Sequence, residues 1–254
     1  CNEFTADGRD NGLRPANVVQ DELDYHNMFV GQYAMGDIKF SNYTSVNNLH
    51  GMYWKTSKNF ADGSLYHIEN SRFLQDPLDP YGQLQLLGPG GAFTFGVRST
   101  RFAGGPVGFG ALCAGQHCGE AGAGGPCDTQ VLLHDVDFSG VHEGHRKIKF
   151  GVNAQDPGYV LPIFLAKDNS LGGHRAMVSQ HLDGFADVEG CKKLGPEWEN
   201  SYGCDVAIRR LNIWSKNLGN LKIDGPGYAV PPNLASPVHG MNSGVLLWEH
   251  RHRG

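Results

Sequence analysis

The sequence lacks the features that mark several common functional classes. It has no run of about 20 apolar residues, the length that a membrane helix needs. Its net charge of −5 gives no basic footprint for nucleic acid. No GxSxG nucleophile elbow, no P-loop and no GxGxxG turn ahead of a helix is present. We therefore expect no transmembrane segment, no nucleic-acid partner and no cofactor.

Helical periodicity is also scarce. Few windows carry apolar residues at i, i+3, i+4 and i+7, and the 36 glycines among 254 residues lower helix propensity throughout. Short runs that alternate apolar and polar residues between Gly, Asn, Asp and Pro are common instead, which is typical of strands. These runs are 37–46, 64–73, 82–87, 131–138, 146–150, 205–214 and 220–223. We predict an all-β fold with little helix.

Several of these runs have the shape of solenoid coils. The segment 40–54 consists of a short strand, an Asn-rich corner and a second short strand, and 68–73 and 133–140 are alike. Asn suits such corners because it tolerates left-handed backbone. We predict a right-handed parallel β-helix (a solenoid) with long Gly/Pro-rich, disulfide-stapled loops. Two Gly- and Pro-rich loops, 103–128 and 225–240, interrupt the coil period. A β-sandwich is the alternative.

On these segments and on 208–215, the chain resembles extracellular parallel β-helix proteins of the fibrocystin-like and cell-surface hyaluronidase kind. The resemblance covers about half the chain. It implies a secreted or surface glycoprotein built on stacked coils, and it assigns no catalytic residue. The chain begins at Cys1 without an initiator Met and ends in a charged tail. We therefore expect a single β-rich domain, 1–254, within a longer extracellular polypeptide.

Cysteine usage favours an oxidising compartment. Three cysteines lie in one Gly-rich segment, two flank a polar loop and one begins the chain: Cys113, Cys118, Cys127, Cys191, Cys204 and Cys1. A zinc site would need a matching second pair, which is missing, so we expect disulfides and no metal. We predict that Cys191 pairs with Cys204 and that no other thiol is free, with the state of Cys1 alone left open. The other pairings stay open.

Two further patterns fit an extracellular location. Asn42-Tyr43-Thr44 is an acceptor sequence for N-glycosylation, and we predict glycan on Asn42 in a eukaryotic source. Aromatic residues at strand ends are candidates for stacking on sugar rings, although most aromatic residues of a protein belong to the core. The best-placed candidates are Tyr53, Trp54 and Trp214.

Catalytic candidates are few. If the chain is an enzyme, the best cluster is the acidic turn of His181, Asp183, Asp187 and Glu189, because a glycosidase needs two carboxyl groups across the scissile bond. A solvated turn ahead of Cys191 explains the same residues. His142-Glu-Gly-His145 could bring two imidazoles to one metal, but a polar loop between strands is the simpler interpretation.

Three functions follow, in order of preference. The first is a structural or adhesive extracellular module that contacts neighbouring domains or copies of itself in a filament or matrix. The second is a polysaccharide-acting hydrolase or lyase on a β-helix. The third is a carbohydrate-binding module. Clustered cysteines, Gly-Pro-Gly turns at 88–90 and 225–227 and the missing catalytic motifs favour the first.

Overall fold

The computed structural model confirms an all-β chain. It describes residues 2–5, 16–56, 63–75, 82–86, 94–111, 130–150, 163–165, 173–180, 189–206, 208–214, 228–229, 236–238 and 242–249. Within these ranges the only helical element is one 3-10 turn, η3 (Pro196–Trp198). The same ranges contain no helix that is long and apolar enough to cross a membrane. The Gly-Pro-Gly turns and the run 220–223 lie outside them.

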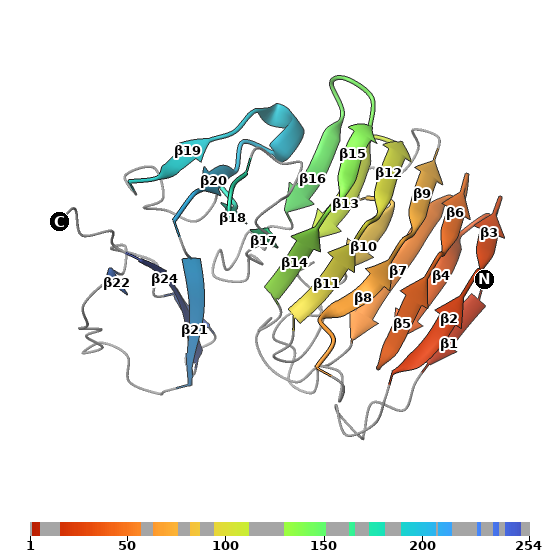
Figure 1. Cartoon of the computed structure of the whole chain (residues 1–254), viewed down its shortest axis with the longest axis horizontal. Coiled ribbons are helices and arrows are strands. Elements are labelled where there is room, and N and C mark those ends of the chain that lie inside the picture. Colours follow the sequence, from red (N-terminus) through yellow and green to blue (C-terminus); the bar gives the residue numbers. More distant parts are fainter. Residues whose placement is uncertain are drawn as a thin grey trace.

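Three parallel sheets run side by side along the chain (Figure 1). Sheet A contains β1 (Asn2–Thr5), β4 (Val30–Met35), β7 (His50–Thr56), β10 (Leu84–Leu86), β13 (Val107–Ala111) and β16 (Arg146–Phe150). The parallel part of sheet B contains β2 (Asn17–Gln20), β5 (Ile38–Ser41), β8 (Tyr66–Glu69), β11 (Thr94–Arg98), β14 (Gln130–His134) and β17 (Ile163–Leu165). Sheet C contains β3 (Leu23–Tyr25), β6 (Thr44–Val46), β9 (Arg72–Gln75), β12 (Arg101–Gly104) and β15 (Asp137–Gly140).

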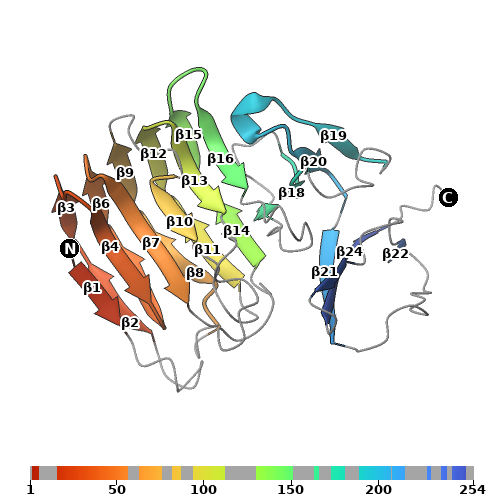
Figure 2. The same cartoon turned by 180° about the vertical axis from the view of Figure 1, so that it is seen from behind.

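Each turn of the chain adds one strand to every sheet, in the order B, C, A. Every strand pairs with its counterpart one turn later, so β5 pairs with β8 and β6 with β9. Figure 2 shows the strands of sheet A from the opposite side. Connections of variable length lie at two corners: those from sheet A back to sheet B (36–37, 57–65, 87–93, 112–129 and 151–162) and those from sheet C to sheet A, which range from 105–106 to 76–83. The corner from sheet B to sheet C, in contrast, always spans two residues.

Six of the seven predicted runs contain strands, and the run 220–223 lies outside the described residues; three of the six are each two strands. Runs 37–46, 64–73 and 131–138 all begin in sheet B and end in sheet C. The predicted loop 103–128 is partly wrong as well, because β13 occupies 107–111 despite three nearby glycines. Local alternation identified the strands, but it did not show where the chain turns between sheets.

The bend between sheets B and C is made by a left-handed residue. At this corner φ lies between 47° and 58° in five consecutive turns of the chain: Asp21, Asn42, Asn70, Ser99 and Asp135. Short polar side chains tolerate this conformation best, since they can hydrogen-bond locally. Backbone N–H groups at the corner bond to the next turn, as from Asn42 to the Glu69 carbonyl at 3.1 Å. The same bond to the next turn is made by Asp21, Asn70 and Ser99, so the sharp corner is held by hydrogen bonds between turns.

The core lies between the three sheets. In sheet C the rings of Phe73, Phe102 and Phe138 stack in line, with centroids 5.1 Å apart and planes within 10° of parallel. Trp198 of η3 closes the stack edge-on against Phe138 at 5.9 Å. Trp54 fills the space between sheets A and B and packs on Phe95 at 4.9 Å. Successive turns thus contribute large rings at equivalent positions.

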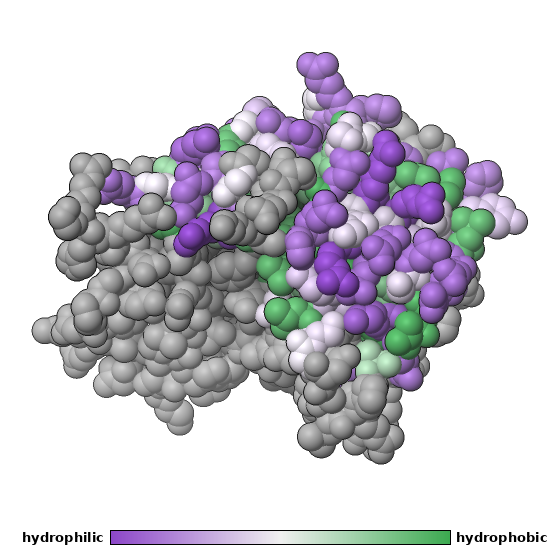
Figure 3. All heavy atoms as spheres, in the orientation of Figure 1, coloured by the Kyte–Doolittle hydropathy of each residue, from purple (hydrophilic) through white to green (hydrophobic). Residues whose placement is uncertain are grey.

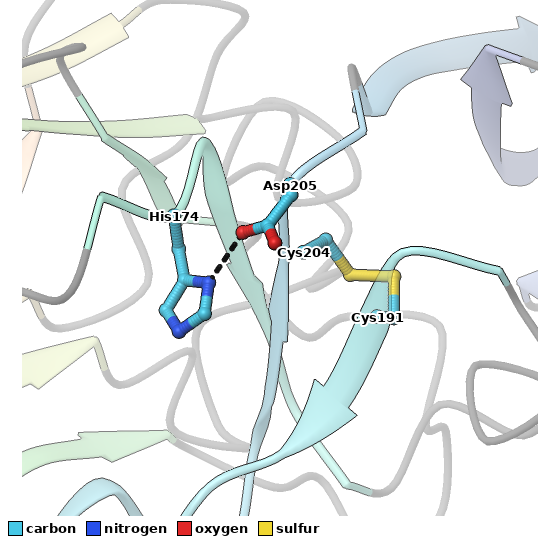
Figure 4. Close-up of a disulfide and its surroundings, with 4 residues drawn as sticks. All are labelled: His174, Cys191, Cys204 and Asp205. Atoms are coloured by element: carbon cyan, nitrogen blue, oxygen red, sulfur yellow. Dashed lines mark hydrogen bonds and ion pairs between the residues drawn. A yellow bond between two sulfur atoms is a disulfide. The ribbon is translucent and has the colours of Figure 1, made fainter. Parts of the chain in front are cut away.

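One end of the stacked sheets is closed by an antiparallel extension of sheet B. It consists of β18 (Ala176–Val178), β20 (Tyr202–Cys204) and β19 (Cys191–Lys193). A disulfide between Cys191 and Cys204 joins β19 to β20, which confirms the predicted pair (Figure 4). Closing a loop of 13 residues contributes about 3 kcal/mol by the chain-entropy model. Cys1, Cys113, Cys118 and Cys127 lie outside the described residues.

A fourth sheet, D, is formed by the last part of the chain. Its central strand β24 (Asn242–Glu249) pairs antiparallel with β21 (Ile208–Trp214), β22 (Tyr228–Ala229) and β23 (Ser236–Val238). Part of the predicted loop 225–240 therefore belongs to short strands. Because all its pairings are antiparallel, sheet D does not continue the repeat of sheets A to C.

Candidate binding site

Strand β7 places the two predicted sugar-stacking residues on opposite faces. Successive side chains of a strand point to opposite sides, so Tyr53 faces outward from sheet A while Trp54 points into the core. Trp54 is fully buried, and its ring offers no face to a sugar. The expectation for Trp54 is therefore corrected. Tyr53 is partly exposed, and Trp214 lies at the end of β21, paired with Asn242.

Tyr53 belongs to an aromatic cluster on the outer side of sheet A. Its ring centroid lies 5.0 Å from that of His50 and 5.9 Å from that of Phe29, which meets it edge to face. Tyr33, on the neighbouring strand β4, contacts Tyr53 at 6.4 Å. Phe29 remains more than half exposed. Edge-to-face contacts of this kind fix ring orientation, so the cluster presents a preformed aromatic surface.

A pocket opens beside this cluster, at the corner where sheet C turns into sheet A. We call it the corner pocket. It measures about 240 Å³ and is lined by His26, Asn27, Met28, Asn47, Asn48, Leu49 and Gln75. Two successive turns of the chain contribute three residues each, and the third turn contributes Gln75. No Asp, Glu, Lys or Arg is among the lining residues, so the pocket suits a neutral ligand with hydroxyl or amide groups.

A buried polar network holds the wall of the corner pocket in place. Asn48 donates from Nδ2 to the Asp24 carbonyl at 3.0 Å and to Ser45 Oγ at 2.9 Å. Its Oδ1 accepts from both the backbone and the side chain of Asn27, at 2.8 and 2.9 Å. All four hydrogen-bonding positions of the Asn48 amide, two N–H groups and two oxygen lone pairs, are thereby used. Asn48 is therefore structural, and it fixes Asn27 at the pocket.

The same network extends to a buried carboxylate. Asp24 Oδ2 accepts from Gln32 Nε2 at 2.7 Å and from the Tyr43 hydroxyl at 3.0 Å. Burial, and secondly the charge of Asp24, raise the pKa of Tyr43 far above its usual range. The phenol therefore stays protonated and acts as a donor at all physiological pH values. Because the hydrogen bonds span the first two turns of the chain, they keep these turns in register.

Gln75 differs from the other amides of the corner. It is 5% exposed, yet among the described residues neither Nε2 nor Oε1 of its side chain has a hydrogen-bond partner. A buried polar group without a partner costs about 1–3 kcal/mol. The chain thus holds an unsatisfied amide at the floor of the corner pocket, and such a group calls for a specific explanation.

The outer faces of sheets B and C carry mainly polar and charged residues (Figure 3). On sheet B, Glu69 forms an ion pair with Arg98 at 2.8 Å, and Lys39 lies 4.0 Å away on the other side. The Arg98 guanidinium also lies over the Tyr66 ring at 4.6 Å. Surface pairs of this kind contribute at most about 1 kcal/mol each. This face is therefore a solvated surface with internally matched charge.

The acidic turn proposed for catalysis falls largely outside the described residues. His181, Asp183 and Asp187 are not among them, and Glu189 is exposed ahead of β19. Nearby, His174 donates from Nδ1 to Asp205 Oδ1 at 2.7 Å (Figure 4). Gly203 lies against that ring, where a β-carbon would come within 2.7 Å of it. This histidine therefore serves packing beside the disulfide.

His142 and His145 line a second, more polar pocket of about 510 Å³, together with Ser139, Val141, Glu143, Gly144, Lys147 and Glu197. The two imidazole centroids are 5.8 Å apart, and His145 donates from Nδ1 to the Gly105 carbonyl at 3.0 Å. Across the described ranges, no three His, Cys, Asp or Glu side chains converge as metal ligands do. The two histidines lie in the polar loop that the simpler interpretation predicted.

Asn42 lies exposed at the B-to-C corner, with φ of 54°. Its Nδ2 donates to Asp21 Oδ1 at 2.7 Å. A glycosylated Asn keeps one N–H on Nδ2, so this hydrogen bond is compatible with a sugar. We expect secretion from a eukaryotic host to add one N-glycan here, visible as a mass shift that glycosidase removes. Thr44→Ala should abolish the shift while Asn42 remains, and an unmodified wild-type protein would contradict the prediction.

No protein-family model matches this chain. No curated protein and no solved structure matches it either.

The sequence analysis proposed Tyr53 as a sugar-stacking residue, but it did not single out the residues that line the corner pocket. The overlooked pattern is a repeat: His26-Asn-Met-Phe29 and Asn47-Asn-Leu-His50 each follow a short strand of sheet C. Each carries a left-handed first residue, then Asn, then an exposed apolar side chain. Their spacing of 21 residues equals that between β2 and β5, which links the two corners to the same repeat.

Proposed function

We propose that this chain is a structural or adhesive module of an extracellular assembly, and that it associates through the end of the sheets formed by β2 and β3. The single observation that carries the proposal is the apolar character of this end. Val18, Leu23 and Tyr25 are each more than half exposed there. In the described part of the chain, β2 and β3 pair along one edge only. Unpaired edge strands template association with another chain.

The two ends of the stacked sheets differ, and this difference indicates which end would contact a second copy of the chain. The far end is covered by the β19–β20 hairpin, its disulfide and Trp198. The β2–β3 end has no such cover among the described residues. Self-association would therefore join two copies open end to open end, giving a closed, two-fold symmetric dimer. The Cys191–Cys204 disulfide supports an oxidising, extracellular location.

We further infer that sheets A, B and C form a right-handed parallel β-helix. Each connection between paired parallel strands is a crossover, and such crossovers are right-handed in almost all proteins because of strand twist. The regular order B, C, A and the left-handed corner residues support this interpretation.

Sedimentation velocity over a range of protein concentrations tests the association. We expect the wild-type chain to form dimers and Leu23→Lys to weaken dimerisation at least about tenfold, because an unpaired charge would be buried in the interface. Leu65→Lys is the matched control, since Leu65 is also an exposed leucine but directly precedes β8, away from the terminal strands β2 and β3. A wild-type chain that stays monomeric at all concentrations, or a dimer that Leu23→Lys leaves unchanged, would contradict the proposal.

A further inference from the structure

We propose that the corner pocket binds a single neutral sugar unit of a glycan. This site is separate from the β2–β3 end, and the proposal stands independently of self-association. It depends on three observations: the unsatisfied Gln75 amide, the neutral amide lining and the adjoining aromatic cluster.

The Gln75 amide is the first of these observations. Both of its polar atoms are buried without a partner in the described ranges, and the residue lines the pocket. The terminal amide of glutamine turns easily about its last torsion. It can therefore donate to, or accept from, a hydroxyl group that enters the pocket. Such a ligand would supply the hydrogen bonds that the Gln75 amide lacks within the described ranges, which favours a polyhydroxylated molecule over an apolar one.

The lining and the size of the pocket narrow the ligand further. Side-chain amides contribute both donors and acceptors, as sugar hydroxyls require, and a pocket lined by no Lys or Arg provides no permanent positive charge for a phosphate or sulfate. The volume of about 240 Å³ is below the usual ~300–1,000 Å³ of sites for larger ligands. It therefore fits one ring rather than an extended chain segment.

The exposed apolar side chains beside the pocket complete the site. Met28 is 92% exposed, and Leu49 is 41% exposed. Phe29 follows Met28 directly and joins the aromatic cluster of His50 and Tyr53. A sugar ring presents an apolar face of C–H bonds, and the electron-rich faces of aromatic rings attract it. A neighbouring sugar of the same glycan can stack on this cluster while the first ring occupies the pocket.

Ligand-observed NMR with methyl glycosides of glucose, galactose, mannose and N-acetylglucosamine, and with their disaccharides, tests the proposal. We expect saturable binding of at least one of them. Gln75→Leu removes the amide at similar volume, so it should weaken binding about tenfold or more. It should also raise the thermal midpoint of the free protein, because an unsatisfied buried amide disappears.

A matched pair of surface variants tests sugar binding without changing the buried Gln75. A folding defect caused by a substitution at Gln75 therefore cannot affect this comparison. Leu49 and Leu65 are both 41% exposed, but only Leu49 lines the pocket. Leu49→Ala should reduce sugar binding several-fold, and Leu65→Ala should leave it unchanged. The proposal is overturned if no glycoside binds saturably, if short peptides bind and glycosides do not, or if Leu49→Ala and Leu65→Ala bind equally well.

Discussion

Replacing Phe102 with alanine is expected to destabilise the protein by about 3–5 kcal/mol, because truncating a buried aromatic ring leaves a cavity. Phe102 is fully buried and stacks between Phe73 and Phe138, 5.1 Å from each. A loss of this size is comparable to the whole stability of many domains, ~5–15 kcal/mol. Urea denaturation followed by circular dichroism measures the change in free energy of unfolding.

The control for this prediction is Phe29→Ala. Phe29 is more than half exposed and meets the surface rings of His50 and Tyr53 edge to face, so its truncation should cost below about 1 kcal/mol. If Phe102→Ala is too unstable to purify, Phe102→Leu should give a smaller, measurable loss. Equal stability losses at Phe102 and Phe29 would show that the stack does not form part of a packed core.

The second large effect is expected at Gly104, where alanine should cost about 2–5 kcal/mol. The residue has φ of +68°, and a β-carbon would lie 1.8 Å from the Gln75 carbonyl oxygen of the neighbouring turn. The left-handed conformation alone costs about 1–2 kcal/mol with a side chain, and the forced separation of two turns adds about 1–3 kcal/mol. Thermal and urea unfolding of Gly104→Ala measure the sum.

Gly144→Ala separates the two contributions to this loss. Gly144 also has positive φ, +80°, but no atom lies within 4 Å of its ideal β-carbon position. It should therefore show the conformational cost alone, about 1–2 kcal/mol. If Gly104→Ala and Gly144→Ala lower the free energy of unfolding by similar amounts, the turns of sheet C are less closely stacked at Gly104 than in the structure.

The sequence alone determined the secondary structure class and much of the strand pattern. Alternating residues and scarce helical periodicity depend on local chemistry, which a single sequence carries. The Cys191–Cys204 pair was also predictable, because two cysteines that flank one short polar loop need only a hairpin to meet. The left-handed corners were visible as Asn at 42 and 70, although Ser99 and Asp135 occupy the same position with different side chains.

Only the tertiary structure decided which face of a strand is buried and which corners come together. Tyr53 and Trp54 are adjacent on one strand, so alternation requires that they face opposite ways, yet it does not say which one faces the core. The corner pocket joins three turns of the chain, from His26 to Gln75. Its parts become neighbours because parallel pairing stacks successive turns in register, apart from local bulges, although the loops at two of the three corners differ in length. That register depends on hydrogen bonds between turns, which no local pattern in the sequence records.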